Sequence, residues 1–158
     1  MIKDKYFRAN VGAIIINSKN DVLAFERSDH KGSWQLPQGG IQQDEEILDS
    51  IKREVKEETG ILENELKLIG VYPDWMVYEL PKEMRNEKIG RGQIQKWFLF
   101  RIIKKKLNID LNNFKEREFC NWKWMSMAEL VDIVVEFRKP TYKKLKTWLS
   151  KMISKKKA

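Results

Sequence analysis

The sequence is poor in the side chains that most often serve as nucleophiles and transition-metal ligands. It has one cysteine, Cys120, and one histidine, His30, which are far apart along the chain. A single cysteine excludes an intramolecular disulfide bond and favours a reducing cytoplasm. We interpret Cys120 as a half-buried small residue and His30 as a surface imidazole in a polar loop, because no pattern joins them into a thiol–imidazole pair.

Long apolar runs are also absent. No stretch approaches the roughly 20 apolar residues that a transmembrane helix requires, and residues 1–12 lack the apolar core of a signal peptide. The 158 residues are 42% hydrophobic and 34% charged, which is typical of a folded chain that buries a core. We therefore expect one domain, residues 1–158, located in the cytoplasm and without membrane contact.

The charge of the chain is strongly asymmetric. The net charge is +8, yet residues 44–65 hold nine acidic and three basic side chains, so that segment is −6 and the remainder is +14. The basic excess favours polyanionic partners such as nucleotides or nucleic acid. Like charges at helical spacing destabilise a helix unless something offsets them, so the acidic segment calls for an explanation.

Three segments have the pattern of helices. Apolar residues recur at helical spacing from Asp44 to Thr59, and Gly60 is placed to end that helix. A capping-box pattern at Ser126 opens a second helix that runs to about Val135. A third helix is predicted after Pro140, with one apolar face made of Tyr142, Leu145, Trp148, Leu149 and Met152.

Strands are predicted on both sides of the first helix. Runs of β-branched and aromatic residues predict them at 11–17, 21–27, 66–72, 75–80 and 93–103. Residues 18–20 suggest a hairpin between the first two, residues 30–40 a loop, and residues 81–92 a polar, exposed and mobile connection. We assign Trp34 and Trp97 to core packing. This order indicates an α/β layered fold with a mixed sheet.

The acidic segment places three carboxylates on one helix face. Glu54, Glu57 and Glu58 are three and four residues apart, and their face borders the apolar stripe. A solvated face is the ordinary interpretation of such a cluster. Three features favour a ligand instead: Gly39-Gly40 lets backbone come close to one, Arg53 is placed to fix the carboxylates by pairing, and the rest of the chain is positive.

Clustered carboxylates without a nearby histidine or thiolate favour hard cations. Mg²⁺ and Mn²⁺ prefer oxygen ligands. Such ions would convert a cluster that repels a polyphosphate into one that holds it, and would acidify a water molecule. The acidic segment therefore predicts a cradle for Mg²⁺ or Mn²⁺, with more than one ion.

These residues carry a resemblance to a known family. Gly39, five residues, Glu45, seven residues, and then Arg53-Glu54-Val55-x-Glu57-Glu58-x-Gly60-Ile61 resemble the complete 23-residue Nudix box. The resemblance implies a Nudix-type α/β/α sandwich with a mixed β-sheet. It also implies hydrolysis of nucleoside diphosphates linked to another moiety, with Mg²⁺ or Mn²⁺.

The resemblance extends over nearly the whole chain. Ser33-Trp34-Gln35-Leu36-Pro37-Gln38-Gly39-Gly40-Ile41 is similar to the approach to the box in dinucleoside polyphosphate hydrolases and bacterial RNA 5′-pyrophosphohydrolases. Similarity to the latter continues at 7–12, 78–82, 95–98 and 134–137. The turn at 42–44 and the connection around 83–90 depart from that pattern.

The resemblance implies one main activity and two alternatives. The main one is conversion of 5′-triphosphate or 5′-diphosphate RNA ends to monophosphate. The second is cleavage of dinucleoside polyphosphates such as diadenosine tetra- or pentaphosphate. The third is a Nudix-fold module that binds nucleotides or RNA without turnover, which has no need for an intact carboxylate cluster.

The resemblance also implies roles for single residues. The metal ligands are Gly39, Glu54, Glu57, Glu58 and Glu118, and the catalytic residues are Glu57, Glu118 and Arg53. Glu118 joins the metal site or acts as general base, Glu57 competes for the base role, and Glu116 is the fallback. Substrate contacts are expected from Arg8, Arg27, Ser33, Tyr78 and Phe137.

The chemistry of the substrate residues fits these roles. Guanidinium groups of Arg8 and Arg27 match phosphate oxygens, and Tyr78 and Phe137 offer rings on which a base can stack. Residues 138–158 contain nine bases and no acid. That basic helix, with its tail at Lys155–Lys157, is a candidate guide for RNA, although a solvated face with a frayed end explains it equally well.

Overall fold

The computed structural model describes residues 2–112 and 116–157, with side chains as far as Lys155. The described strands are β1 (Phe7–Ile16), β2 (Val22–Arg27), β3 (Trp34–Gln35), β4 (Gln38–Gly40), β5 (Leu66–Val71), β6 (Met76–Glu79), β7 (Gly92–Ile102) and β8 (Phe119–Met125). The helices are α1 (Ile47–Thr59), α2 (Met127–Ile133) and α3 (Lys139–Lys157). Short 3₁₀ helices lie at η1 (Ile2–Asp4), η2 (Glu63–Glu65), η3 (Lys82–Met84) and η4 (Glu136–Arg138). None of the helices in this described part is long and apolar enough to cross a membrane.

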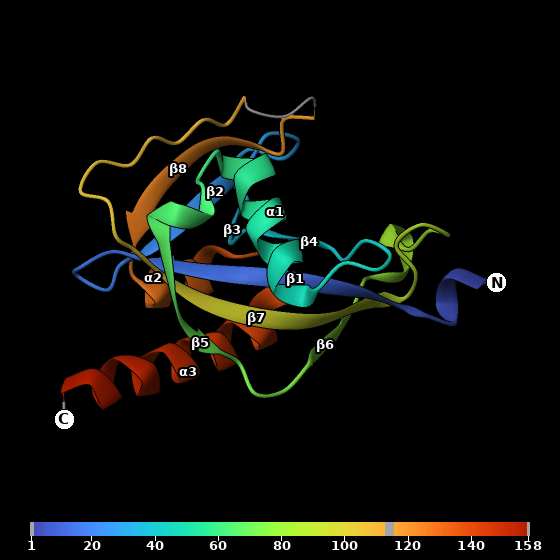
Figure 1. The fold of residues 1–158 in the computed structure, drawn as a ribbon. Helices are drawn as coiled ribbons and strands as arrows, with labels where there is room; N and C mark the ends of the chain where they lie inside the picture. Colours follow the sequence, from blue (N-terminus) through green and yellow to red (C-terminus); the bar gives the residue numbers. More distant parts are fainter. Residues whose placement is uncertain (1, 113–115, 158) are drawn as a thin grey trace.

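The strands form one mixed sheet in the order β3-β2-β1-β7-β5, with β4 on β1, β6 on β7 and β8 on β2 (Figure 1). The centre is a parallel pair, β1 and β7, in register from Phe7 opposite Gly92 to Ile16 opposite Arg101. The other pairings are antiparallel. The expected mixed sheet is confirmed.

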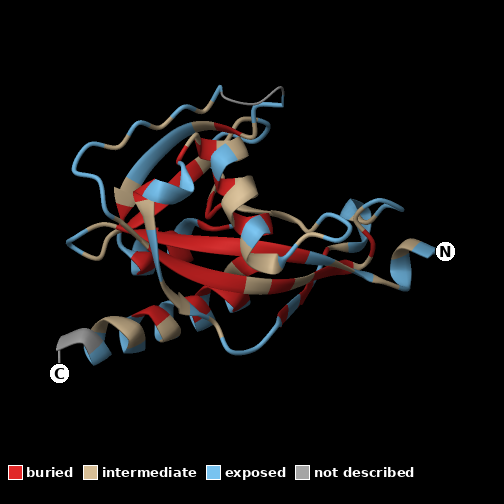
Figure 2. Ribbon diagram, in the orientation of Figure 1, coloured by how far each residue is buried: buried red, intermediate tan, exposed pale blue. Residues whose placement is uncertain are grey.

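Helices cover both faces of the sheet, with α1 on one side and α2 and α3 on the other (Figure 1). Because side chains alternate along a strand, β1 supplies both layers. Val11, Ala13 and Ile15 pack with Ile51 and Val55 of α1, whereas Ile14 and Ile16 belong to the cluster that contains α2 and α3 (Figure 2). The α/β/α sandwich is confirmed, and so is the apolar face of α3, formed by Tyr142, Leu145, Trp148, Leu149 and Met152.

Residues with left-handed backbone lie beyond both ends of α1. Gly60 has φ 78° and its N–H donates to the Lys56 carbonyl, so it ends α1 as expected. The start of α1 was placed at Asp44, which is wrong, because Asp44 has φ 61° and the helix begins at Ile47. A left-handed residue cannot continue into a right-handed helix, so residues 42–46 form a turn instead.

The capping pattern before α2 is half realised. The Ser126 hydroxyl accepts a hydrogen bond from the Glu129 N–H, as expected, and α2 then ends at Ile133, two residues before the predicted Val135. The third helix begins at Lys139 rather than after Pro140. Proline is tolerated there because the first-turn N–H groups of a helix have no intrahelical acceptor.

Three strands were not predicted. β3 and β4 lie inside the stretch expected to be a loop, and each is too short to show a period. The β8 strand buries only its ends, Phe119 and Met125, and leaves Trp122 exposed, so its hydrophobic pattern does not alternate as a half-buried strand should.

The connection at 81–92 is largely exposed and is anchored at its centre. It contains η3, and the Arg85 guanidinium at its centre donates to the Leu80 carbonyl at 3.0 Å and to Asp4 at 3.2 Å. Its side chains Met84 and Ile89 line a cavity of about 670 Å³. Residues 82–84 and 86–88 are exposed, so the expected exposure is confirmed for most of the connection. Its expected mobility stays a prediction.

Candidate active site

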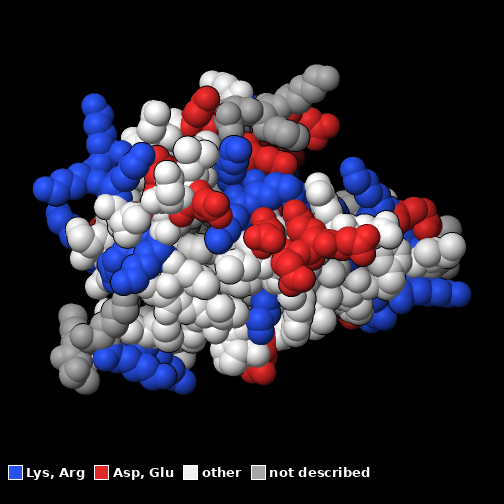
Figure 3. All heavy atoms as spheres, viewed as in Figure 1, with Lys and Arg blue, Asp and Glu red and all other residues white. Residues whose placement is uncertain are grey.

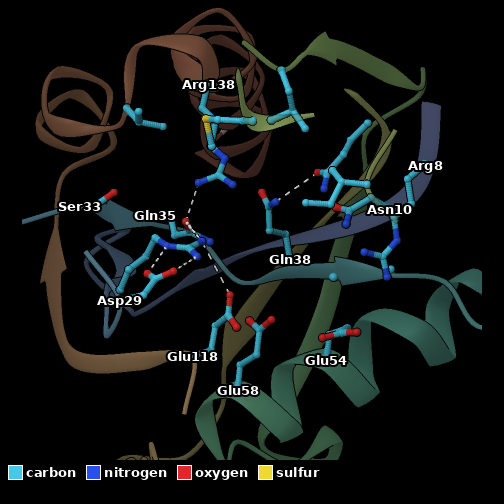
Figure 4. A pocket seen from close by; sticks show the side chains of 18 of the residues that line it. Arg8, Asn10, Asp29, Ser33, Gln35, Gln38, Glu54, Glu58, Glu118 and Arg138 are labelled. Carbon is cyan, nitrogen blue, oxygen red and sulfur yellow. Dashed lines mark hydrogen bonds and ion pairs between the residues drawn. The ribbon is translucent and has the colours of Figure 1, made fainter. Parts of the chain in front are cut away.

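One cavity of about 670 Å³ collects almost every side chain singled out in the sequence. It opens between the Glu54–Glu58 face of α1, the strands β1, β4 and β7, and the η4 segment (Figure 4). Its lining includes Arg8, Arg27, Ser33, Gly39, Glu54, Glu57, Glu58, Tyr78, Glu116, Glu118 and Phe137. Arg53 is the exception, since it lies on the other side of the carboxylates and does not line the cavity.

Arg53 ties the acidic segment together. Its Nε donates to Glu45 Oε2 at 2.7 Å, and its Nη1 donates to Glu54 at 2.8 Å and to Glu57 at 3.3 Å. Nη2 donates to the Gly40 carbonyl at 2.9 Å and again to Glu45. One guanidinium thus pairs with three carboxylates and joins α1 to the glycine strand, which offsets part of the repulsion within the acidic segment. Figure 3 shows the acids gathered over α1.

Gly39 lets the backbone pass against the Glu54 carboxyl. A Cβ at position 39 would stand 2.0 Å from Glu54 Cδ, so no other residue fits without moving that side chain. Gly40 has the same relation to Arg8, whose Nη2 would lie 2.2 Å from an added Cβ. The two glycines therefore hold a carboxylate and a guanidinium close to one strand.

Glu58 is the most perturbed acid of the site. Burial raises the pKa of the Glu58 carboxyl well above its usual range, and the charges of Glu54 and Glu118 raise it further. Burial also raises the pKa of Glu54, against the lowering effect of the Arg53 hydrogen bond. Glu58 Oε2 is buried and has no hydrogen-bond partner in the described structure, which is the state of an oxygen awaiting a proton or a cation.

Glu118 faces this cluster from the loop before β8. The Ser28 N–H and hydroxyl both donate to the Glu118 carbonyl, which fixes its backbone. Its carboxylate is 40% exposed and lies 3.7 Å from Arg27 Nη1. Glu116 also lines the cavity and is exposed.

Arg27 is held by a partner that the sequence did not suggest. Its Nε and Nη2 donate to the two Asp29 oxygens, each at 2.8 Å, and its Nη1 donates to Gln35 at 3.2 Å. The Arg27 hydrogen bonds hold the pKa of Asp29 below its usual range. Arg27 therefore lines the cavity with its Nε and Nη2 bonded to Asp29, and its Nη1 lies 3.7 Å from the Glu118 carboxylate.

The Arg8 side chain, unlike that of Arg27, is not paired with another side chain of the described residues. Within residues 2–112 and 116–157 its guanidinium makes no hydrogen bond or ion pair, although it lines the cavity beside Gly40. Ser33 lines the far side, and its backbone closes the 28–33 turn through Ser33 N–H to His30 and Arg27 N–H to Ser33. Arg8 thus offers a guanidinium whose ordinary partner would be an anion.

The aromatic pair contact one another. The Tyr78 and Phe137 ring centroids are 5.8 Å apart and tilted by 32°, which leaves no room for a third ring between them. Tyr78 is 7% exposed and its hydroxyl donates to Gln93, so it is mostly core. Phe137 is half-buried, and the Arg138 guanidinium carbon lies over its ring, 5.1 Å from the centroid.

Several cavity residues were missed by sequence reasoning. Asn10, Gln35 and Gln93 are buried polar residues of the floor, and Arg138 is 8% exposed in the wall, where it donates to Gln35 at 2.6 Å (Figure 4). A signal was present: polar residues occupy alternate positions of strands that are otherwise apolar. Such residues are costly to bury unless they serve a network or a ligand.

The donor set fits a hard divalent cation. The side chains that could hold it are all carboxylates, Glu58 carries an unpartnered buried oxygen, and Gly39 leaves room for close backbone approach. In the described part of the chain, no three His, Cys, Asp or Glu side chains are already gathered as a metal site. Arg53 accounts for this, because it draws Glu54 and Glu57 to itself.

The remaining two sequence candidates lie at the margin. His30 is exposed at the cavity rim and Cys120 is half-buried, as expected. The Cys120 thiol contacts Glu26 at 3.7 Å, with no imidazole beside it in the described residues. The reducing compartment inferred from one cysteine stays a prediction.

Comparison with known proteins identifies the family of this chain. The NUDIX domain family matches residues 6–149. The chain belongs to the Nudix family. Nudix hydrolases generally use divalent metal ions.

Relatives agree with this assignment. The chain is 38% identical over 145 residues to an RNA pyrophosphohydrolase of Ruthia magnifica subsp. Calyptogena magnifica, with 90% of this chain and 80% of that protein covered. It is 36% identical over 150 residues to Nudix hydrolase 25 of Arabidopsis thaliana, with 88% and 83% covered. A C. elegans Ap4A hydrolase structure in a binary complex superposes with a TM-score of 0.67 at 20% identity, covering 90% of this chain and 98% of that one, which shows the shared fold.

Proposed function

We propose that this Nudix protein is a metal-dependent hydrolase of 5′-polyphosphorylated nucleotides that acts chiefly as an RNA 5′-pyrophosphohydrolase. It converts 5′-triphosphate or 5′-diphosphate RNA ends to monophosphate, with release of pyrophosphate or phosphate. The observation that carries the proposal is one cavity in which the α1 carboxylates and Glu118 face Arg8 and Arg27. The 38% identity to an RNA pyrophosphohydrolase supports the choice of substrate.

Two arginines bind the polyphosphate in this proposal. Arg8 has no partner in the described residues and therefore gives its whole fork to phosphate oxygens. Arg27 is oriented by Asp29 and presents its Nη1 edge, so it adds positive charge without changing conformation. The half-buried Phe137 supports the base of the nucleotide by stacking.

The carboxylates of α1 hold the metal. Glu54, Glu57 and Glu58, with Glu118 and the Gly39 backbone, would ligate Mg²⁺ or Mn²⁺, and we propose more than one ion. When bound, these ions neutralise phosphate oxygens and acidify a water molecule. Arg53 is a positioning residue, because it touches the carboxylates and not the cavity.

A carboxylate then accepts the proton of the attacking water. The water oxygen bonds to phosphorus, the phosphoanhydride P–O bond breaks, and the departing phosphate leaves with the bonding electrons. We propose Glu118 as the base, because it is partly exposed and sits on a loop at the cavity. Glu57 is the competing candidate, since it also lines the cavity.

The basic surface of α3 supports RNA as the substrate. This helix begins directly after Phe137 and Arg138 in the cavity wall and carries the exposed Lys143, Lys144, Lys146 and Lys151. Phosphates downstream of the first nucleotide would meet these side chains.

Cleavage of dinucleoside polyphosphates, such as diadenosine tetra- or pentaphosphate, is the second candidate. It is favoured by the similarity of residues 33–41 to such hydrolases, and it requires only the cavity itself. A binding module without turnover is the third, and it is disfavoured because a pure binder has no need for all of Glu54, Glu57 and Glu58 at one cavity.

One experiment separates these candidates. Purified protein is given triphosphorylated RNA and diadenosine tetraphosphate side by side with Mg²⁺, and kcat/KM is measured for each. The proposal expects the higher value for RNA. A higher value for diadenosine tetraphosphate would select the second candidate, and no magnesium-dependent turnover of either would leave the binding module.

A further inference from the structure

Four amide side chains form a connected group at the cavity floor: Asn10, Gln38 and Gln93 line the cavity, and Gln95 contacts all three without lining it. Asn10 of β1, Gln38 of β4, and Gln93 and Gln95 of β7 lie side by side because β1 pairs with both other strands. Asn10 is 2% exposed, Gln93 9% and Gln95 1%. Burying amides costs free energy unless they are hydrogen-bonded, so the direction of each one is a physical question.

Trp97 decides the direction of the first amide. The indole Nε1–H can only donate, and it lies 3.1 Å from a terminal atom of Gln95. That atom must be the Gln95 carbonyl oxygen, because an amide nitrogen would place two donors face to face. The Gln95 NH₂ group therefore points the other way, toward its neighbours on the floor.

The orientation of the Gln95 amide then fixes the orientation of the neighbouring amides. The Gln95 Nε2 lies 2.8 Å from Asn10, 3.2 Å from Gln93 and 3.3 Å from Gln38, so each of these neighbours turns its oxygen toward Gln95. The Tyr78 hydroxyl and the Gln38 NH₂ also donate to the Gln93 oxygen, which reinforces the same orientation. Asn10 and Gln93 are thereby fixed with their NH₂ groups on the opposite side.

Those two NH₂ groups face the cavity. Both residues line it, and among the described residues neither amide nitrogen has an acceptor. Neither is among the polar atoms sealed from solvent, so each is accessible to a ligand. In Figure 4, Asn10 and Gln38 lie between the carboxylates below them and the Arg138 wall above.

We propose that Asn10 and Gln93 donate hydrogen bonds to the bound nucleotide, and that Gln95 and Trp97 are positioning residues that lock both donors in place. The ligand groups are hydrogen-bond acceptors: phosphate oxygens, or the carbonyl and ring nitrogens of a base. A floor of donors repels other donors, so it distinguishes ligands by the acceptors they present. The inference rests on the proposed function only in taking a nucleotide as ligand.

The first test removes one donor. Asn10→Ala leaves Gln95 with two acceptors, Gln38 and Gln93, for its two hydrogens, so the network should remain satisfied. Binding of α,β-methylene-ADP with Mg²⁺ is measured by calorimetry, and affinity should fall about tenfold. The matched control is Asn121→Ala on exposed β8, where the lost bond comes from the Trp122 backbone and affinity should be unchanged.

A second ligand identifies the acceptor. Methylenebisphosphonate carries the same non-hydrolysable phosphates without a nucleoside. An equal loss of affinity for both ligands in Asn10→Ala means a phosphate contact, whereas a loss for α,β-methylene-ADP alone means a contact with the nucleoside. Unchanged affinity for both ligands overturns the proposal.

The third test asks whether Gln95 acts through Asn10. Gln95→Met removes the lock and frees the Asn10 amide to turn, so nucleotide affinity should fall in the native background. In an Asn10→Ala background the same substitution should change affinity little, because its target is gone. In RNA turnover Gln95→Met should raise KM and leave kcat within about threefold.

The outcomes are separable. If Gln95→Met lowers nucleotide affinity equally in the native and Asn10→Ala backgrounds, Gln95 does not act through Asn10 and the positioning role is refuted. Thermal melting of each variant checks that it is folded. Binding that responds as predicted in a protein that hydrolyses no RNA refutes the proposed function and leaves this inference standing. RNA hydrolysis by the native protein, together with unchanged ligand affinity in Asn10→Ala, refutes this inference and leaves the proposed function standing.

Discussion

Gly39 and Glu54 are in such close contact that a Cβ on the glycine would stand 2.0 Å from the Glu54 carboxyl carbon. The Glu54 side chain is also held by Arg53 at 2.8 Å. The strand and the helix of the Nudix box are therefore matched atom to atom at the point where the proposed metal ligands lie. This contact predicts that activity and stability respond very differently to one methyl group.

Gly39→Ala should lower kcat by about 100-fold or more, because the displaced Glu54 loses its place in the site. The melting temperature should change little, since the clash falls on the end of a side chain and not on backbone. Gly70→Ala is the matched control, because there an added Cβ meets the end of Met152, away from the cavity. Phosphate release and thermal melting measure both effects, and a fully active Gly39→Ala would contradict the site.

Replacing Glu57 with glutamine should nearly abolish turnover. The substitution keeps size and helix propensity while removing a charge from the cavity, and loss of an electrostatic contact of this kind costs about 100-fold or more. Glu63→Gln, at an exposed ion pair with Lys52, should leave activity intact. Phosphate release at saturating Mg²⁺ is the measurement, and near-native activity of Glu57→Gln would remove α1 from the mechanism.

Glu118→Gln should slow the chemical step far more than it weakens substrate binding, because a base acts in the transition state. Its loop position, 3.7 Å from Arg27, is retained by the amide. Single-turnover rates and Kd are compared with those of Glu116→Gln, the neighbouring cavity acid. A collapse in Glu116→Gln with an unchanged Glu118→Gln would move the role two residues back.

RNA turnover should depend on salt more steeply than turnover of diadenosine tetraphosphate. Each phosphate neutralised on single-stranded RNA adds about 0.7 to the slope of log affinity against log salt. Changing Lys143, Lys144 and Lys146 to glutamine should reduce the RNA slope and spare the dinucleotide, because these exposed side chains lie outside the cavity. Parallel salt profiles for the two substrates would count against guidance by α3.

Truncation after Ser154 is a companion experiment for the tail Lys155–Lys157. It removes no residue of the buried clusters. If the tail guides RNA, RNA turnover should fall at moderate salt while diadenosine tetraphosphate turnover is retained. An unaffected truncation would exclude the tail alone and leave the α3 lysines in place. The side chains of Lys156 and Lys157 lie outside the described residues.

Glu45 should make stability depend on acid pH. The Arg53 and Ser50 hydrogen bonds lower the pKa of Glu45 to about 2 from its ordinary 4.5. A carboxyl with a depressed pKa in the folded state stabilises the protein above its unfolded pKa, and that contribution disappears as pH falls toward the folded value. The stability difference between native protein and Glu45→Gln should therefore be constant from pH 7 to about 5 and shrink between 4.5 and 2.

Urea unfolding at several pH values measures that difference. Glu46→Gln is the control, since Glu46 precedes α1 without a side-chain cap bond. A difference that stays constant down to pH 2 would show that the pKa of Glu45 is the same in the folded and unfolded states, so that the Glu45–Arg53 pair does not form in solution.

Local pattern determined what was predictable from the sequence. The spacing of Glu54, Glu57 and Glu58 places them on one helix face because the α-helix has 3.6 residues per turn, and the structure keeps them at one cavity. The hairpin of β1 and β2 and the glycine end of α1 also follow from nearby residues alone. Backbone preferences within a few residues suffice for such features.

Only the tertiary structure decided which distant residues meet. The parallel pairing of β1 with β7 sets Asn10 opposite Gln95, and β8 beside β2 brings Glu118 to Arg27. No periodicity encodes these contacts, because their free energy comes from burying two helix layers against one sheet. The start of α1 was misjudged for the same reason, because the left-handed backbone of Asp44 is not visible in the apolar spacing. The hydrogen bond from Arg85 to Asp4 likewise joins residues that no local pattern links.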